Sequence, residues 1–439
     1  MKQTAFFPKF SLPDKQSPNH TMVRERRLKS NFFLKACSLH FPILTVIMHG
    51  SHCLSAIAKI CFLVLSFFSS FLSSSAQELS ASTNLFRDGD ALIKQELDFK
   101  SPGRKGEKVV WDFSQLSFKD KEYRCEYMAN GDSLFEMLTP SATYIYKLEQ
   151  DTLLKTGYEM PNLSMKYVVP QRILKFPFCY SDSMSSCFVA LGTYSHLLRM
   201  HVYGHSTVAA DATGILLLPD GTGYGNAIRI HDHTVYGERM YSLSDGIMEM
   251  MTAGDVMKRL DSDSVKWIVD TYQWYARGYR YPVFETIETR ICNKGDSLQH
   301  FRNAYYIARD VQEDLYTDEV NERLREMALE NYAAQDVGQN VSSESLSQNS
   351  DFHSFHYNCF LTDGNQNLKI EFYREKPSPI EITLSNVHGI VYHHARLEAG
   401  TGIEAMDFSV SDLPAAVYIL SVSVDGERFS EKIDIDRKQ

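Results

Sequence analysis

Hydrophobic and polar residues alternate along most of the chain after about residue 107, in short runs separated by turn residues. Runs such as "TYIYKLEQ", "LLKTGYEM" and "NAIRIHDH" recur at intervals of roughly 8–12 residues, with Gly, Asp, Asn or Pro between them. Because successive side chains on a strand point to opposite faces, this period of two predicts antiparallel strands. The spacing is typical of a sandwich or a barrel. We expect a mainly β domain over residues 77–315 and favour an antiparallel β-sandwich.

The pattern changes to a helical period near residue 316. In "YTDEVNERLREMALENYAAQ" (316–335) the apolar positions include Val320, Leu324 and Met327, close to helical spacing. A stretch rich in Ser, Gln and Asn follows, so residues 316–352 are expected to form a helical connector and a flexible linker. Alternation then returns, with "VDGE" as a hairpin turn. Residues 353–439 are therefore expected to form a compact, immunoglobulin-like β-sandwich.

The start of the chain has the layout of an export leader. The apolar run "ICFLVLSFFSSFL" (60–72) follows a lysine, and small residues precede a signal-peptidase cut after Ala76. Residues 48–76 are therefore expected to be a signal peptide. Met48 stands where an initiator is expected, so we interpret residues 1–47 as an upstream extension that is not part of the native product.

Charge and cysteine content limit the function further. Residues 1–76 carry nine Lys or Arg and two Asp or Glu, so the remainder has a net charge of −17, compared with −10 for the whole chain. An acidic surface argues against nucleic acid or an anionic membrane as a partner. Five cysteines follow the leader. Of these, Cys179 and Cys187 could close a small disulfide loop in an oxidising compartment, and none has the spacing of a zinc site.

The stretch "DATGILLLPDGTGYGNAIRIHDH" (211–233) raises the question of metal binding or catalysis. The candidates for metal ligands or an acid–base pair, with two histidines upstream, are Asp211, His231, Asp232, His233, His201 and His205. His231 and His233 are two residues apart and share one strand face. No carboxylate or thiolate stands at the spacing of a structural metal site, and no GxSxG or HExxH motif is present. We therefore interpret the stretch as a hairpin around "PDGTGYGN", without a metal, a cofactor or a catalytic residue.

A cluster of aromatic residues in "TYQWYARGYRYP" is a candidate binding surface. Its members are Tyr272, Trp274, Tyr275, Tyr279 and Tyr281, and aromatic rings on a β-sheet can stack on sugars. Trp274, Tyr275 and Tyr279 are the residues we would assign to a glycan ligand. The alternative, which we favour, is that alternate members fill the core and the others cover a hairpin.

The C-terminal region resembles the sorting domain of proteins exported by the type IX secretion system of certain Gram-negative bacteria. The matching segments are "LSNVHGIVY" and "LPAAVYILSVSVDGERFSEKIDI", and the matching positions are Gly389, Leu413, Pro414, Tyr418 and Lys432. Ala416 stands where the family usually has Gly. The resemblance covers about a fifth of the chain. It implies a secreted Bacteroidetes-type protein, and the outer-membrane secretion machinery as its partner.

These observations favour an exported, non-catalytic protein at the cell surface, in the outer membrane or outside the cell. The periplasm is the alternative location. A surface carbohydrate-binding protein is the first alternative function, with the aromatic cluster as its site. The second is a secreted hydrolase, in which Asp211 or His231 would be essential.

Overall fold

The computed structural model describes residues 77–245, 250–338 and 355–436. The expected upstream extension, the expected signal peptide and most of the expected linker lie outside these ranges. The described residues are mainly β, as the alternation predicts. Among the described helices, none is both long and apolar enough to cross a membrane.

The described residues between 77 and 338 contain fifteen strands and four helices. The strands are β1 (Glu78–Leu79), β2 (Ala91–Leu97), β3 (Gly106–Asp112), β4 (Phe118–Asn130), β5 (Leu134–Leu138), β6 (Thr143–Glu149), β7 (Thr152–Met160), β8 (Leu163–Lys175), β9 (Phe178–Cys179), β10 (Ser183–Tyr194), β11 (Leu198–Leu217), β12 (Gly223–Ser242), β13 (Val265–Tyr275), β14 (Phe284–Asn293) and β15 (Asp296–Tyr306). The helices are α2 (Ala81–Asn84), α3 (Ala253–Ser262), α4 (Arg309–Glu313) and α5 (Glu319–Gly338).

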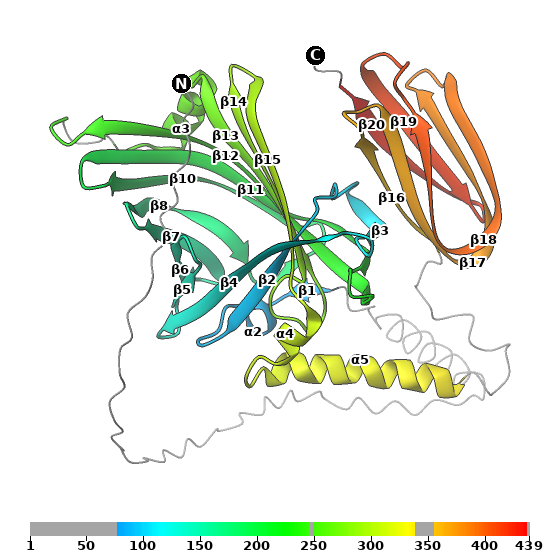
Figure 1. Cartoon of the computed structure of the whole chain (residues 1–439), viewed down its shortest axis with the longest axis horizontal. Coiled ribbons are helices and arrows are strands. Elements are labelled where there is room, and N and C mark those ends of the chain that lie inside the picture. The colour runs from blue at the N-terminus through cyan, green and yellow to red at the C-terminus, as the bar shows by residue number, and fades with distance from the viewer. Residues whose placement is uncertain (1–76, 246–249, 339–354, 437–439) are drawn as a thin grey trace, which may run out of the picture. The chain divides into compact units, whose positions relative to one another are not determined.

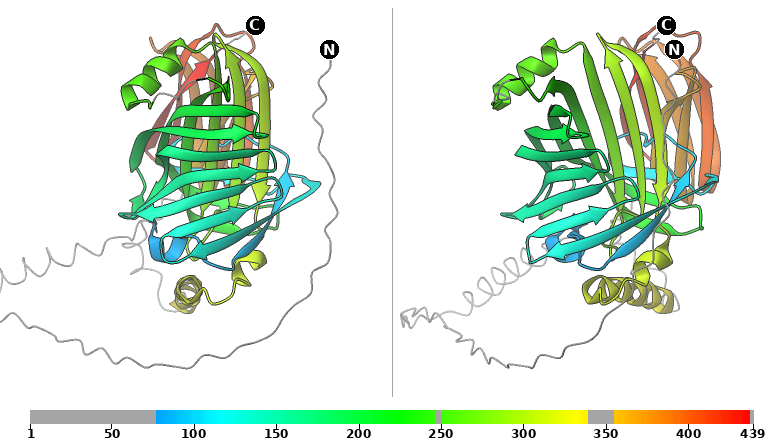
Figure 2. Two further views of the ribbon diagram at one scale, coloured as in Figure 1. Left: turned by 90° about the vertical axis from the view of Figure 1, so that its left-hand side faces the viewer. Right: turned by 60° about the vertical axis from the view of Figure 1, so that its left-hand side comes forward.

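Twelve of these strands close into a barrel (Figure 1). Their order is β10-β8-β7-β6-β5-β4-β2-β15-β14-β13-β12-β11, and β11 pairs again with β10. In Figure 2, strands β4 to β8 run across the long strands β11 to β15 behind them. The expectation of a two-sheet sandwich is not confirmed here, because β10 pairs with β8 on one side and β11 on the other. Closure leaves no free edge in the ring.

The hairpin expected at "PDGTGYGN" is present and joins the two longest strands of the barrel, β11 and β12. Leu217 pairs with Gly223, and the amide of Leu218 donates to the carbonyl of Thr222 at 2.9 Å. Strand β3 lies against β11 on its other side as a parallel neighbour. Trp111 of β3 is fully buried and its ring packs against that of Trp274 on β13. Strand β3 therefore covers part of the outer face of the barrel.

Three helices gather at one end of the barrel, where α5 lies below α2 and α4 (Figure 1). The helix expected over 316–335 is confirmed as α5. Asp318, just before α5, binds the buried guanidinium of Arg280, which also donates to the α2 carbonyl of Ser82. The other helices were not expected. Among them, α3 begins at a capping box formed by Thr252 and Asp255.

The C-terminal region forms a separate five-stranded sheet around its own core. Its strands are β16 (Phe355–Thr362), β17 (Asn367–Asn386), β18 (Val391–Ser409), β19 (Ala416–Val424) and β20 (Glu427–Ile435). The long strand β17 pairs with β18 along one side and with β16 and then β19 along the other. The expected turn at "VDGE" is confirmed, since Val424 pairs with Glu427. The five strands form one curled sheet, so the expected sandwich is not confirmed.

The disulfide considered between Cys179 and Cys187 is not present. All five cysteines of the described residues are free thiols. The Sγ atom of Cys179, on β9, lies 3.9 Å from a carboxylate oxygen of Glu78. That of Cys187, on β10, lies 3.8 Å from the carbonyl oxygen of Ala253. The two cysteines therefore belong to different local environments.

Candidate metal centre

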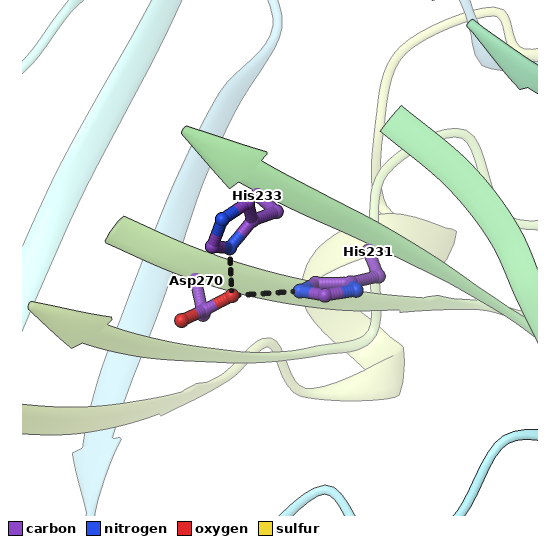
Figure 3. A group of neighbouring side chains, drawn as sticks. All are labelled: His231, His233 and Asp270. Carbon is purple, nitrogen blue, oxygen red and sulfur yellow. Dashed lines mark hydrogen bonds and ion pairs between the residues drawn. The ribbon is translucent and has the colours of Figure 1, made fainter. Parts of the chain in front are cut away.

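Two histidines and one aspartate converge on the outer face of the barrel (Figure 3). His231 and His233 lie on β12, and Asp270 lies directly opposite His233 on β13. His231 Nε2 is 2.9 Å and His233 Nδ1 is 2.7 Å from the same carboxylate oxygen, Asp270 Oδ1. One potential ligand atom from each residue lies within 4.8 Å of the other two. The alternation of side chains explains why both histidines reach one partner.

The ring of His231 is held from three sides. Its Nδ1 atom lies 3.7 Å from Asp211 Oδ2, and its plane stacks on Tyr272 with a centroid distance of 4.1 Å. Asp211 is itself bound by Arg229, which donates through Nε at 2.7 Å and Nη2 at 3.1 Å. Since Arg229 is fully buried, Asp211 has little freedom to move. His231 therefore sits in a defined orientation between two carboxylates.

An arginine binds the other carboxylate oxygen of Asp270. Arg290 Nη2 donates to Asp270 Oδ2 at 3.0 Å. Burial alone would raise the pKa of Asp270, but the hydrogen bonds from His231 and His233 outweigh it and lower that pKa well below its usual range. The same hydrogen bond to Asp270 raises the pKa of His233, against the opposing effect of burial. Asp270 is therefore a permanent anion at neutral pH.

Asp270 is the residue that sequence reasoning missed. It lies on the next strand, and only the pairing register places it beside His233. Asp232, by contrast, points to the opposite, inner face, where it accepts a hydrogen bond from the hydroxyl group of Thr234. His205 also stays apart, with its Nε2 atom 2.7 Å from Ser185 Oγ.

His201 does not join the group either. Its ring is 5% exposed and its Nε2 atom is buried without a hydrogen-bond partner among the described residues. As for Asp211, both of its oxygens face Arg229, which argues against a role as a general base.

The aromatic residues proposed for a glycan are buried. Trp274 is 0%, Tyr275 8% and Tyr279 5% exposed. Trp274 and Tyr279 belong to the core beneath β3, whereas Tyr275 packs inside the barrel with Ile228 and Ile230. A sugar has no exposed ring face to stack on at these three residues. The structure also departs from the alternative in which only Tyr272 and Trp274 line the core, since Tyr275, Tyr279 and Tyr281 are buried and Tyr272 is half-buried.

Comparison with known proteins does not supply a family. No protein-family model matches the chain, and no curated protein matches it significantly.

The five positions of the sorting-motif resemblance lie in the C-terminal sheet. Gly389 is in the turn between β17 and β18, and Lys432 is exposed on β20. Tyr418 is 2% and Leu413 7% exposed, and both belong to the core. The Tyr418 hydroxyl donates to the carbonyl of Pro414 at 2.9 Å, so these residues hold the loop before β19 in place.

Proposed function

We propose that the chain is an exported, non-catalytic protein whose C-terminal region, residues 355–436, is a sorting domain read by an outer-membrane secretion machinery. The region has a core of its own, built from all five of its strands and the loop before β19, which a signal recognised as a folded unit requires. The barrel is then the cargo, carried to the cell surface or the medium.

The observation that carries this proposal is the meeting of distant motif positions at one end of the sheet. Asn386, which begins the turn containing Gly389, pairs with Tyr418 across β17 and β19. Lys432 pairs with Ile419, the next residue of β19. The turn around Gly389 and the exposed Lys432, which are more than 40 residues apart in the sequence, therefore lie towards the same end of the sheet, while Tyr418 and Leu413 support them from the core.

This surface has exposed apolar side chains around the turn. Val387 is 63%, Ile390 58% and Val391 53% exposed. Gly389 has a φ of 83°, a backbone conformation that residues with a Cβ atom rarely adopt. The space around this glycine is open. Apolar groups gathered at an exposed turn are typical of a surface that binds another protein.

The finer fold expected from the resemblance also belongs to this proposal. A tyrosine near the start of a strand that donates back to a carbonyl four residues upstream is the corner found in immunoglobulin-like sandwiches. Tyr418 and Pro414 have this arrangement. This hydrogen bond supports the proposal that the curled sheet is related to immunoglobulin-like sandwiches.

The proposal is tested by mass spectrometry of both termini of the native protein from fractionated cells. We expect surface or medium material that begins at Gln77 and ends near residue 352. Periplasmic protein with an intact Gln439 would contradict sorting. Ile390→Asp and Lys432→Glu should each reduce the exported fraction severalfold. Lys376→Glu, an exposed lysine elsewhere on β17, is the matched control and should be exported normally.

A further inference from the structure

We propose that His231, His233 and Asp270 bind one divalent transition-metal ion, with Zn²⁺ as the best match, on the outer face of the barrel. The donor set of two imidazole nitrogens and one carboxylate oxygen is one that Zn²⁺ prefers in proteins. The site is independent of the export proposal, since it lies on β12 and β13 of the barrel.

The geometry is close to a coordinated one. Zinc takes its nitrogen and oxygen ligands at about 2.0–2.2 Å, which places tetrahedral donors about 3.4 Å apart. Here the two nitrogen atoms lie 2.9 and 2.7 Å from Asp270 Oδ1. Shifts of a few tenths of an ångström therefore open the centre. On binding, each of the two ring nitrogens loses its proton, either to the second nitrogen of the same ring or to solvent, and holds the ion through the freed lone pair.

The surroundings prepare the ligands in the manner of known zinc sites. The ring N–H of a metal-binding histidine that does not face the metal usually donates a hydrogen bond to a carboxylate, which fixes the orientation and tautomer of the ring. Asp211 lies on this side of His231, with 3.7 Å between Oδ2 and Nδ1, which is longer than a hydrogen bond but close enough for one to form after a small shift, and the buried Arg229 holds Asp211. Stacking on Tyr272 fixes the ring plane.

The neighbouring charged side chains leave the fourth ligand position of the ion open. Arg290 occupies Asp270 Oδ2, so the ion has Oδ1 as its single oxygen ligand from this residue. Glu288, the cross-strand neighbour of Asp270 on β14, is bound by His300 at 2.7 Å, and within the described part of the chain no hydrogen bond or ion pair joins it to His231 or His233. The side chain of His233 is 41% exposed. A fourth ligand would come from solvent or from a partner's side chain.

The test is calorimetric titration of Zn²⁺ alone into the metal-stripped full-length protein, with a competing chelator to resolve tight binding. We expect one Zn²⁺ per chain. His233→Ala and Asp270→Asn should each weaken binding at least tenfold, since each removes a direct ligand. Visible absorbance of the Co²⁺ form checks for a four-coordinate site.

Matched controls separate this site from adventitious histidine binding. His205→Ala and His300→Ala remove histidines of the same barrel face outside the cluster and should leave the affinity unchanged. No binding to the parent protein, or equal affinity in all four variants, would overturn the proposal. His233 is partly exposed, so His233→Ala is expected to fold, and far-UV circular dichroism with a thermal melt verifies this for each variant.

Discussion

Replacing Asp318 by asparagine should destabilise the whole barrel, because Asp318 neutralises a buried arginine at its helical end. Arg280 and Asp318 each have side chains that are 5% exposed. Arg280 Nε donates to Oδ2 at 2.9 Å and Nη2 to Oδ1 at 2.7 Å. Arg280 also binds the carbonyl of Leu85 at 2.7 Å, so one side chain joins the α2 region, the loop before β14 and the start of α5.

The magnitude follows from the charge that is left behind. Removing one partner of a buried pair costs about 3–5 kcal/mol, since the other charge stays buried without compensation. Asparagine keeps the shape and one acceptor, and Arg280 keeps its backbone carbonyls, so we expect the lower end, about 3 kcal/mol. Arg280→Met should cost a similar amount. The double variant should lose less than the sum, because no unpaired charge remains.

The dependence on pH gives an independent check. Burial would raise the pKa of Asp318, but the hydrogen bonds from Arg280 and Asn321 lower it. The folded pKa is thus below the unfolded value of about 3.9, so this stabilisation is complete above that value. It is lost as the pH falls through the folded pKa. Asp318→Asn should therefore approach the parent protein in stability as the solution is made more acidic.

Urea unfolding followed by tryptophan fluorescence, at pH 7 and again below pH 4, measures both effects. Glu319→Gln, the next residue along the chain, is the control because its side chain is exposed. A difference below about 1 kcal/mol at pH 7 would refute the assignment of a buried, coupled pair. So would a large difference that stays constant into acid.

Two further predictions concern single side chains. Burial lowers the pKa of Lys155 to about 8, so its charge opposes folding at neutral pH. Lys155→Met should stabilise the protein by up to about 3 kcal/mol at pH 7 and by little above pH 10.5, as chemical denaturation at both pH values would show. Tyr418→Phe removes the hydrogen bond to the carbonyl of Pro414 and should destabilise the C-terminal sheet by about 1 kcal/mol. Hydrogen exchange of the β19 amides measures this loss. Unchanged protection of these amides would argue against a structural role for the tyrosine corner.

The strands could be predicted from the sequence, but their closure into a barrel could not. Alternation in runs such as "NAIRIHDH" marks where each strand lies, and the turn at "PDGTGYGN" joins β11 to β12 as expected. Closure depends on β10 pairing with β11 while its other edge pairs with β8. That choice follows from sheet twist and from pairing register, which a period of two does not encode.

The same limit explains the aromatic residues. Trp274 and Tyr275 are adjacent, so they must face opposite sides of β13. The inner side is the barrel interior, where Tyr275 lies. The outer side would be exposed, except that β3 arrives from about 160 residues earlier in the chain and buries Trp274 against Trp111. Alternation identifies the two faces of a strand, but it cannot tell which of them another segment covers.

The metal candidate occupies the gap between two covered areas of the same outer face. Towards one end of β12, Arg229 lies beneath β3 beside Trp111. Towards the other end, Val235 packs beneath α3 against Val256 and Leu260. His231 and His233 fall between these two cores, where polar side chains are partly shielded yet still reached by solvent. Because both cores consist of other residues, a variant that removes His233 can abolish ion binding while the barrel remains folded.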